Sequence, residues 1–216
     1  MPKLYTYFRS SAAYRVRIAL ALKGVAHEAI RVHLARNGGE QHSPAYRDKN
    51  PQGLVPAFEL DEGTVLMQSL AIIEYLDETQ PGPALLPADA VGRARVRAIA
   101  QGIACDIHPI NNLRVLQYLG GQLGATQEQK DAWYHHWIAT GLQGLEAMLA
   151  GHPDTDRFCH GDTPTLADCC LVPQLFNARR FNCPLDAYPT LLRIDAACAE
   201  LPAFQQAAPG AQADAE

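Results

Sequence analysis

The first 24 residues constrain the fold most, because they read as a strand, a short polar turn and a helix. The segment Leu4–Phe8 is apolar, aromatic and β-branched, which favours a strand. From Ala12 onward the apolar residues recur at helical spacing, and Gly24 is placed to end the helix. Ser10 and Ser11 lie at the expected helix N-terminus, where backbone N–H groups and the helix dipole bind anions, including a thiolate. The competing interpretation is that one of these serines only caps the helix.

Residues 25–80 continue the alternation of strands and helices. A strand is expected over 29–34, a loop with a short helix over 36–50, a hairpin over 55–67, and a helix over 69–79 with Ser69 as its N-cap. The order β-α-β-α-β-β-α is that of a thioredoxin-like domain. In such domains the peptide bond before a proline at the position of Pro56 is typically cis, a form that has a low energetic cost only before proline.

After a linker rich in proline and glycine, the strand signals largely disappear and helical patterns take over. Helices are expected over 91–119 with a bend at Pro109, over 127–149, from Leu166 onward, and over 189–201. Thr165 and Asp168 are spaced like a capping box. The buried candidates on the 127–149 helix are Trp133, Trp137, Leu142, Leu145 and Leu149. The sequence therefore predicts an α/β plus all-α chain: a thioredoxin-like domain over 1–80, a linker over 81–88, a helical domain over 89–206 and a flexible tail over 207–216.

Composition argues against several classes of protein. The net charge is -5 without a basic block, which disfavours duplex nucleic acid as a partner. No apolar stretch reaches membrane-spanning length, and Lys3 and Arg9 interrupt any signal-like run. The six cysteines form no Cys-x-x-Cys pair, and His135 and His136 are neighbours without metal-ligand spacing. A cytoplasmic protein with free thiols and no metal is expected.

A set of motifs resembles the zeta-class glutathione transferases. The motifs are Tyr7–Ser11 with Arg15–Leu20, then Asn50–Pro56, Gln68–Leu76, Asp106–Leu113 and Leu171–Gln174. They occur in this order over roughly residues 3 to 205, and the ordered set is more specific than any single motif. One departure stands out, because the family usually has Ser-Ser-Cys where this chain has Ala12 as the third residue.

The resemblance implies a glutathione-dependent cis-trans isomerase that converts a maleyl keto acid to its fumaryl isomer. The substrate would be maleylacetoacetate or maleylpyruvate, glutathione the cofactor, and the assembly a homodimer. An alternative stays open: a glutathione transferase that conjugates or dehalogenates small electrophiles such as α-haloacids. Ala12 in place of the family cysteine bears on that choice. A third class, a related module without chemistry, is disfavoured because the motif residues are retained.

The resemblance also assigns the site residues. Ser10 would hold the glutathione sulfur, and because no cysteine precedes Cys105, that sulfur comes from a ligand. A plain capping role suits Ser11 better than Ser10. The glutathione-binding candidates are Ser10, Ser11, Gln41 (with His42 as competitor), Val55, Gln68, Ser69, His108 and Asn112.

Arginines are the candidates for gripping the dianionic substrate, because a guanidinium pairs with a carboxylate bidentately. Arg9 and Arg180 are expected to bind substrate, and Arg15 and Arg180 to act in catalysis beside Ser10. Arg15 is preferred over Arg17, because two residues apart on a helix the side chains point about 200° apart. Arg179 has the position of a cation at a helix C-terminus.

Overall fold

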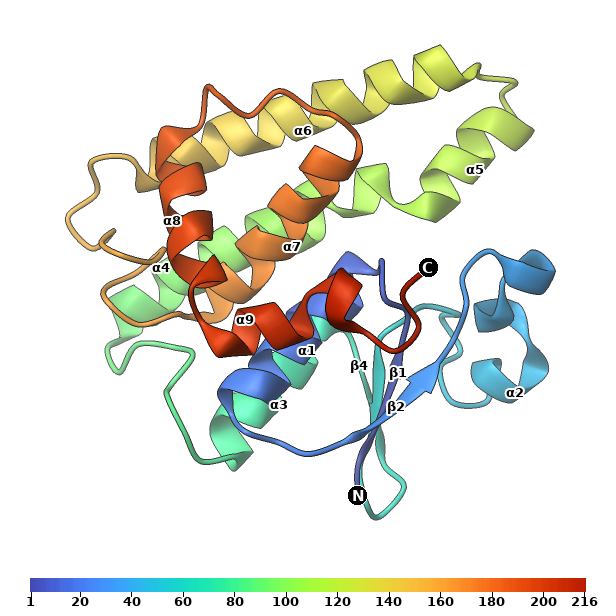
Figure 1. Cartoon of the computed structure of the whole chain (residues 1–216), viewed down its shortest axis with the longest axis horizontal. Helices are drawn as coiled ribbons and strands as arrows, with labels where there is room; N and C mark the ends of the chain where they lie inside the picture. Colours follow the sequence, from blue (N-terminus) through green and yellow to red (C-terminus); the bar gives the residue numbers. More distant parts are fainter. The chain divides into compact units, whose positions relative to one another are not determined.

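The computed structural model describes residues 1–216, which form two compact units (Figure 1). The N-terminal unit contains residues 1–85 together with 199–216, and the helical unit contains residues 86–198. The last residues of the chain thus pack with its first residues. This differs from the predicted division, which gave residues up to 206 to the helical domain and left 207–216 as a flexible tail. Residues 209–211 instead form a 3₁₀-helix, and the segment that follows is hydrogen-bonded to the N-terminal unit.

The N-terminal unit is built on a four-stranded sheet in the order β2-β1-β3-β4. The strands are β1 (Lys3–Thr6), β2 (Glu28–Arg31), β3 (Ala57–Glu59) and β4 (Val65–Met67). β1 is parallel to β2, and the pairs β1–β3 and β3–β4 are antiparallel. Helices α1 (Ser11–Leu22) and α3 (Ser69–Thr79) cover one face, and the short α2 (Pro44–Arg47) lies on the other side (Figure 1). The predicted thioredoxin-like order is therefore confirmed, including a cis peptide bond between Val55 and Pro56.

Helix α1 begins and ends where the sequence indicates, and it is buried along most of its length. Gly24 (φ 65°) ends it, with Gly24 N–H donating to the Ala21 carbonyl and Val25 N–H to the Leu20 carbonyl. α1 packs against both α3 and α9 (Pro202–Ala207), so it shows no solvent-facing stripe. At its end, the buried Lys23 ammonium lies 2.7 Å from the Asp77 carboxylate of α3.

Helix α3 has the predicted bounds, but its N-cap is the residue before the predicted one. Its N-cap position is occupied by Gln68, with φ 70° and no side-chain capping bond, and Ser69 is the first helical residue. The expectation that Ser69 caps α3 is therefore wrong. Its hydroxyl is instead hydrogen-bonded to a side chain of α1, as described below.

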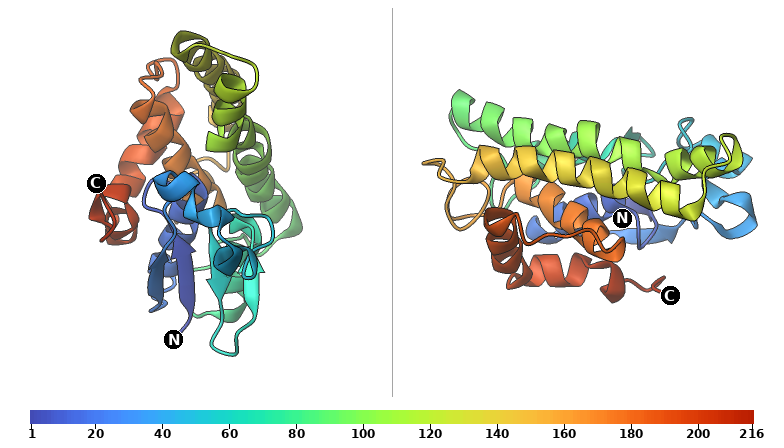
Figure 2. Two further views of the ribbon diagram at one scale, coloured as in Figure 1. Left: turned by 90° about the vertical axis from the view of Figure 1, so that its right-hand side faces the viewer. Right: turned by 90° about the horizontal axis from the view of Figure 1, so that it is seen from above.

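The helical unit consists of α4 (Ala90–Gln101), α5 (Leu113–Gly121), α6 (Gln127–Leu149), α7 (Leu166–Arg180) and α8 (Pro189–Ala199). α4, α6 and α7 lie side by side (Figure 2). The helix expected over 91–119 is broken between α4 and α5 by a π-helical turn over 102–107 and a 3₁₀ turn starting at Pro109. The bend at Pro109 is confirmed, and it begins earlier than the proline alone predicts.

The predicted capping box at the start of α7 is present. Asp168 is fully buried, and its carboxylate accepts the Thr165 N–H at 2.7 Å and the Cys159 N–H at 2.9 Å. Burial raises the pKa of Asp168, while these backbone donors lower it. Apart from Phe176 and the two terminal arginines, the residues of α7 are buried, which confirms it as the centre of its unit.

The burial pattern of α6 corrects one expectation. Trp133 and Trp137 are only half-buried, and their neighbours Tyr134 and Ile138 occupy the core positions. Leu142, Leu145 and Leu149 are buried as predicted.

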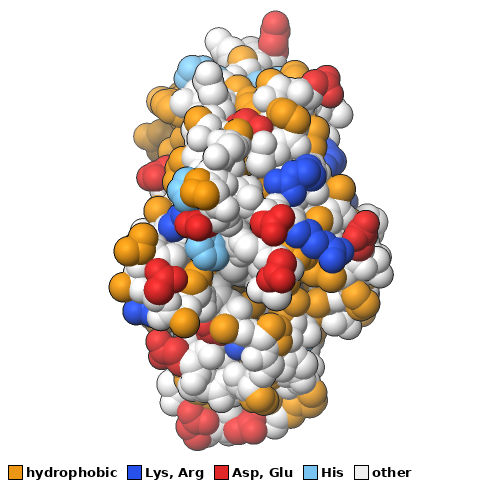
Figure 3. Space-filling model, turned by 90° about the vertical axis from the view of Figure 1, so that its left-hand side faces the viewer, with side chains coloured by type: hydrophobic (Ala, Val, Ile, Leu, Met, Phe, Trp, Pro, Cys, Tyr) orange, Lys and Arg blue, Asp and Glu red, His pale blue; other side chains and the backbone are white.

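The surface carries charges of both signs. On the face drawn in Figure 3, acidic side chains lie beside small, separate groups of lysine and arginine. No helix of the chain combines the length and the apolar character that crossing a bilayer requires.

Two glycines of α6 allow a matched test of how α6 packs against the π-helical turn that contains Ile107. A methyl group on Gly141 would lie 2.5 Å from Cδ1 of the buried Ile107, whereas one on Gly144 would meet nothing within 4 Å. We expect Gly141→Ala to lower the free energy of unfolding by about 1–3 kcal/mol through overpacking. Gly144→Ala should raise it by roughly 0.5–1 kcal/mol through helix propensity. Urea unfolding of both variants measures this, and equal effects at the two sites would contradict the packing described.

Candidate active site

Ser10 lies at the turn between β1 and α1 and is the N-cap of α1. Its Oγ accepts the Ala13 N–H at 3.2 Å, and the residue is half-buried. Ser11 is the first helical residue and only 3% exposed, so the assignment of the capping role to Ser11 is wrong. Capping uses a lone pair of Ser10 and leaves its O–H hydrogen to donate. A thiolate at this position would meet that hydroxyl and the positive end of the helix dipole, both of which lower a thiol pKa.

The start of α3 forms a second cluster. The Arg15 guanidinium donates from Nη1 to Ser69 Oγ at 3.2 Å, and Arg15 is only 1% exposed. The catalytic role expected for Arg15 stays a prediction, and burial places its guanidinium beneath the surface that a ligand would touch. Arg15 places a positive charge behind the N-terminus of α3, where free backbone N–H groups and the helix dipole favour a carboxylate.

Gln68 occupies a strained backbone position at this same helix start. Its φ of 70° lies in the left-handed region, which is unusual for a residue other than glycine, and its exposed side chain donates to Gln52 Oε1 at 2.8 Å. Such conformations persist where the surroundings require them, often at ligand sites. The strained backbone agrees with the prediction that Gln68 binds glutathione.

The loop before cis Pro56 is fixed by two side chains. The Tyr46 hydroxyl donates to the Leu54 carbonyl at 2.6 Å, and the Asn50 amide donates to the same oxygen at 2.7 Å. Burial raises the pKa of Tyr46 to about 12, so the hydroxyl remains a donor at neutral pH. This arrangement holds the backbone of Val55, the predicted peptide-binding residue, in a defined position.

Gln41 lies in a 3₁₀ turn over Glu40–His42, and its expected contact with glutathione stays a prediction. It is buried at 6% exposure, and its Nε2 donates to the Leu34 carbonyl at 3.4 Å, while its Oε1 has no hydrogen-bond partner. His42 is exposed, with Nδ1 3.4 Å from Arg47 Nη2. Of the two candidates in this loop, His42 is therefore the accessible one.

In the helical unit, His108 and Asn112 come together at the break between α4 and α5. Asn112 is the N-cap of α5, where its Oδ1 accepts the Arg114 N–H at 3.2 Å, and its Nδ2 lies 3.4 Å from His108 Nε2. Neighbouring Asn111 is 5% exposed, and neither of its amide atoms has a hydrogen-bond partner. Asn111 is thus a polar group at the same break that the sequence did not single out as a site residue.

The two arginines at the end of α7 have different surroundings. Arg179 pairs with Asp195 at 2.6 Å, an ion pair in addition to its place at the helix C-terminus. Arg180 is exposed and lies 4.5 Å above the Phe181 ring, which in turn stacks on Tyr134 at 3.7 Å. Stacking on Phe181 restricts the orientation of the Arg180 guanidinium, and a fixed orientation favours bidentate pairing with a carboxylate.

Two further residues contact the Ser10 turn: Arg17, which the sequence analysis set aside in favour of Arg15, and Asp214, which it did not single out. Arg17 is 4% exposed and donates to the Phe8 carbonyl at 3.0 Å, and Asp214 accepts the Phe8 N–H at 3.1 Å. A cationic residue within an otherwise apolar helix was the available signal for Arg17. Nothing local marks Asp214, which lies in a short stretch of small and polar residues.

The candidate residues therefore divide between the units. Ser10, Ser11, Arg9, Arg15, Gln41, Val55, Gln68 and Ser69 belong to the N-terminal unit, and His108, Asn112 and Arg180 to the helical unit. No group of three or more His, Cys, Asp or Glu side chains is arranged to hold a metal ion. A hydroxyl at one helix N-terminus, a second helix N-terminus and a cis-proline loop match the thiol, carboxylate and peptide groups of glutathione.

Comparison with known proteins agrees with this chemistry. Residues 4–84 match the model of the glutathione S-transferase N-terminal domain, and residues 131–213 match that of the C-terminal domain. The chain is 55% identical over 214 residues to a maleylpyruvate isomerase from Ralstonia sp., covering 98% of this chain and 99% of the relative.

Two solved structures are similar over nearly the whole chain. The holo structure of a maleylpyruvate isomerase, described as a bacterial zeta-class glutathione S-transferase, has 52% identity and a TM-score of 0.95, covering 99% of this chain and 100% of the other. A maleylacetoacetate isomerase from Anaeromyxobacter dehalogenans 2CP-1, with dicarboxyethyl glutathione and citrate bound in its active site, has 46% identity and a TM-score of 0.88, covering 100% and 98%. Motifs, fold and relatives agree, and the chain belongs to the glutathione S-transferase family, zeta class.

Proposed function

We propose that this protein converts a maleyl keto acid, maleylacetoacetate or maleylpyruvate, to its fumaryl isomer with glutathione as cofactor. The observation that carries the proposal is Ser10, a half-buried hydroxyl at a helix N-terminus whose Oγ is fixed by the Ala13 N–H. No cysteine stands in the N-terminal sheet and helices, so the nucleophile is supplied by the ligand. The ligand of the Anaeromyxobacter relative also supports it, because a dicarboxyethyl group on sulfur is the skeleton that results when a thiol adds to a butenedioate double bond.

Each part of glutathione has a group in the N-terminal unit suited to it. Ser10 would donate to the sulfur, and the α3 N-terminus with Gln68 and Ser69 would take the γ-glutamyl carboxylate. Val55 would offer its backbone N–H and C=O to the cysteinyl part, as in strand addition. Bound glutathione supplies a thiolate that adds to the cis double bond, allows rotation and leaves again. The role of the protein is to keep that sulfur ionised and to orient the substrate.

Two arginines are assigned to the substrate. Arg9 is exposed next to Ser10 in sequence, and Arg180 is held above Phe181. Both guanidiniums suit the carboxylates of a maleyl dianion and the enediolate charge that develops during the reaction. Arg15 acts from beneath the site through Ser69. The homodimer and the cytoplasmic location implied by the family remain predictions for this chain.

The first test follows the absorbance of maleylacetoacetate and of maleylpyruvate with the purified protein, with and without glutathione. We expect glutathione-dependent conversion to the fumaryl product, and the substrate with the higher kcat/KM identifies the preferred compound. No conversion of either compound, with glutathione still bound, would contradict the isomerase and favour the conjugating or dehalogenating transferase.

Replacing Ser10 tests the thiolate assignment. A hydrogen bond to a charged group contributes about 1.5–3 kcal/mol, so Ser10→Ala should lower kcat/KM roughly 10- to 100-fold. It should also raise the pKa of the bound glutathione thiol, measured by thiolate absorbance against pH. Thr126→Ala, which removes the exposed cap of α6, is the control for cap loss and should leave kcat/KM unchanged. Full activity with unchanged glutathione affinity in Ser10→Ala would contradict the assignment of Ser10 to the glutathione thiolate.

Two substitutions at Gln68 separate strain from binding. Both Gln68→Gly and Gln68→Ala remove the side-chain amide and should weaken glutathione binding, measured by calorimetry. Only glycine adopts φ 70° without steric cost, so the glycine variant should be about 1 kcal/mol more stable to unfolding than the alanine variant. Unaltered glutathione affinity in both variants would remove Gln68 from the binding site.

A further inference from the structure

The turn that carries Ser10 is held by the far end of the chain. We propose that Arg17 and Asp214 are positioning residues for Ser10, and that the C-terminal segment 207–214 is a built-in part of the glutathione site. This inference rests on the proposed role of Ser10. It concerns how the hydroxyl is held in place, and neither residue is assigned a contact with the ligand.

Arg17 connects the turn to α9. Its Nη2 donates to the Phe8 carbonyl at 3.0 Å and its Nη1 to the Tyr7 carbonyl at 3.4 Å, while its Nε donates to the Ala207 carbonyl at 2.9 Å. The Tyr7 carbonyl also accepts the Ser10 N–H at 2.9 Å. The Tyr7 carbonyl therefore links the Arg17 guanidinium to the backbone of Ser10, because it accepts a hydrogen bond from each.

Asp214 completes the hold on the same turn. Its Oδ2 accepts the Phe8 N–H at 3.1 Å, so the tail binds the N–H of Phe8 while Arg17 binds its carbonyl. Phe8 is only 4% exposed, and a buried backbone group that loses its partner is costly to leave unsatisfied. Both polar backbone groups of Phe8 thus depend on side chains outside the turn, one from α1 and one 206 residues away.

Charge balance gives Asp214 a second effect. Burial lowers the pKa of Arg17 to about 10, and the nearby Tyr14 and Asp214 act in the opposite direction. Arg17 is still charged at neutral pH, and the Asp214 carboxylate compensates that buried charge. The hydrogen-bond acceptors of Arg17 are all neutral oxygens, so removing Asp214 would take away a nearby negative charge that favours the charged guanidinium while leaving those four bonds in place.

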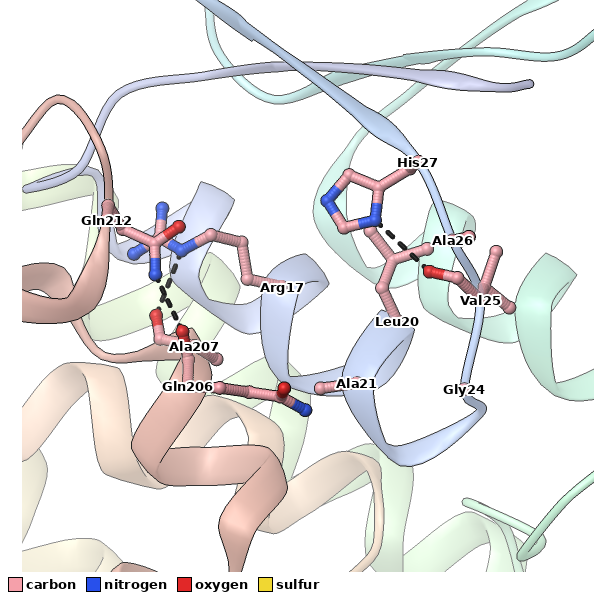
Figure 4. A pocket seen from close by; sticks show the side chains of 10 residues that line it. All are labelled: Arg17, Leu20, Ala21, Gly24, Val25, Ala26, His27, Gln206, Ala207 and Gln212. Atoms are coloured by element: carbon pink, nitrogen blue, oxygen red, sulfur yellow. Dashed lines mark hydrogen bonds between the residues drawn. The ribbon is translucent and has the colours of Figure 1, made fainter.

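Several hydrogen bonds join the tail to the rest of the N-terminal unit. Gln212 donates to the Gln206 and Ala208 carbonyls at 2.8 and 3.0 Å, and Arg31 donates to the Ala213 carbonyl at 3.2 Å. In Figure 4 the Gln212 side chain lies beside the Arg17 guanidinium, next to a cavity of about 370 Å³ that α1, the loop 24–27 and residues of the C-terminal segment line. Because the cavity is open, the C-terminal segment is not closely packed on the side that faces it. Loss of the Asp214 carboxylate, which accepts the Phe8 N–H, should therefore loosen the turn.

The test compares Asp214→Ala with Asp162→Ala, which removes an exposed carboxylate of the helical unit. In the ligand-free protein, amide hydrogen exchange at Phe8 and Ser10 should become faster in Asp214→Ala only. With glutathione, the dissociation constant should rise by about 10-fold, and the pKa of the bound thiol should rise, because the Ser10 hydroxyl is less well placed. Asp214→Asn keeps an acceptor for the Phe8 N–H and should retain most of the exchange protection.

A double-mutant comparison separates positioning from general stability. If Asp214 acts through Ser10, Asp214→Ala should raise the thiol pKa in the natural background and have no further effect on it in Ser10→Ala. An equal effect in both backgrounds, or unchanged exchange and thiol pKa in Asp214→Ala, would overturn the inference while leaving the role of Ser10 intact. Wild-type activity and thiol pKa in Ser10→Ala would instead overturn the role assigned to Ser10, and absence of glutathione-dependent conversion by the natural protein would overturn the proposed function.

Discussion

The N-terminal unit depends on one buried charge, the guanidinium of Arg17. It lies at 4% exposure and donates to the Thr6 hydroxyl and to the Tyr7, Phe8 and Ala207 carbonyls. A buried cation is stable only with good hydrogen-bond partners, and these partners come from the β1–α1 turn and from α9. The same bonds that satisfy the charge therefore join the two ends of the chain and fix the turn on which Ser10 stands.

Arg15 and Arg17 show how one helix serves two parts of the site. Because they lie about 200° apart around α1, they leave it in nearly opposite directions. Arg15 reaches Ser69 at the start of α3, and Arg17 reaches the Ser10 turn. Each supports a helix N-terminus from below, one suited to the glutathione carboxylate and the other to its sulfur.

The errors of sequence reasoning at this site share a physical cause. Ser69 was expected to cap α3, but its hydroxyl is bonded to Arg15, 54 residues away along the chain. On α6, Trp133 and Trp137 were expected to be buried, but the helix direction gives the core positions to Tyr134 and Ile138. In each case the partner or direction was set by packing, which overrides local preference.

The sequence by itself determined what short-range physics controls. The strand–turn–helix at Ser10, the glycine that ends α1 and the Thr165–Asp168 capping box depend on neighbours within a few residues. The ordered family motifs added glutathione and the isomerase chemistry. Only the tertiary structure decided that residues 199–216 return to the N-terminal unit and that Asp214 binds the Phe8 N–H. That contact spans 206 residues, and no local pattern encodes a partner at such a distance, because it forms only when the folded core brings both segments together.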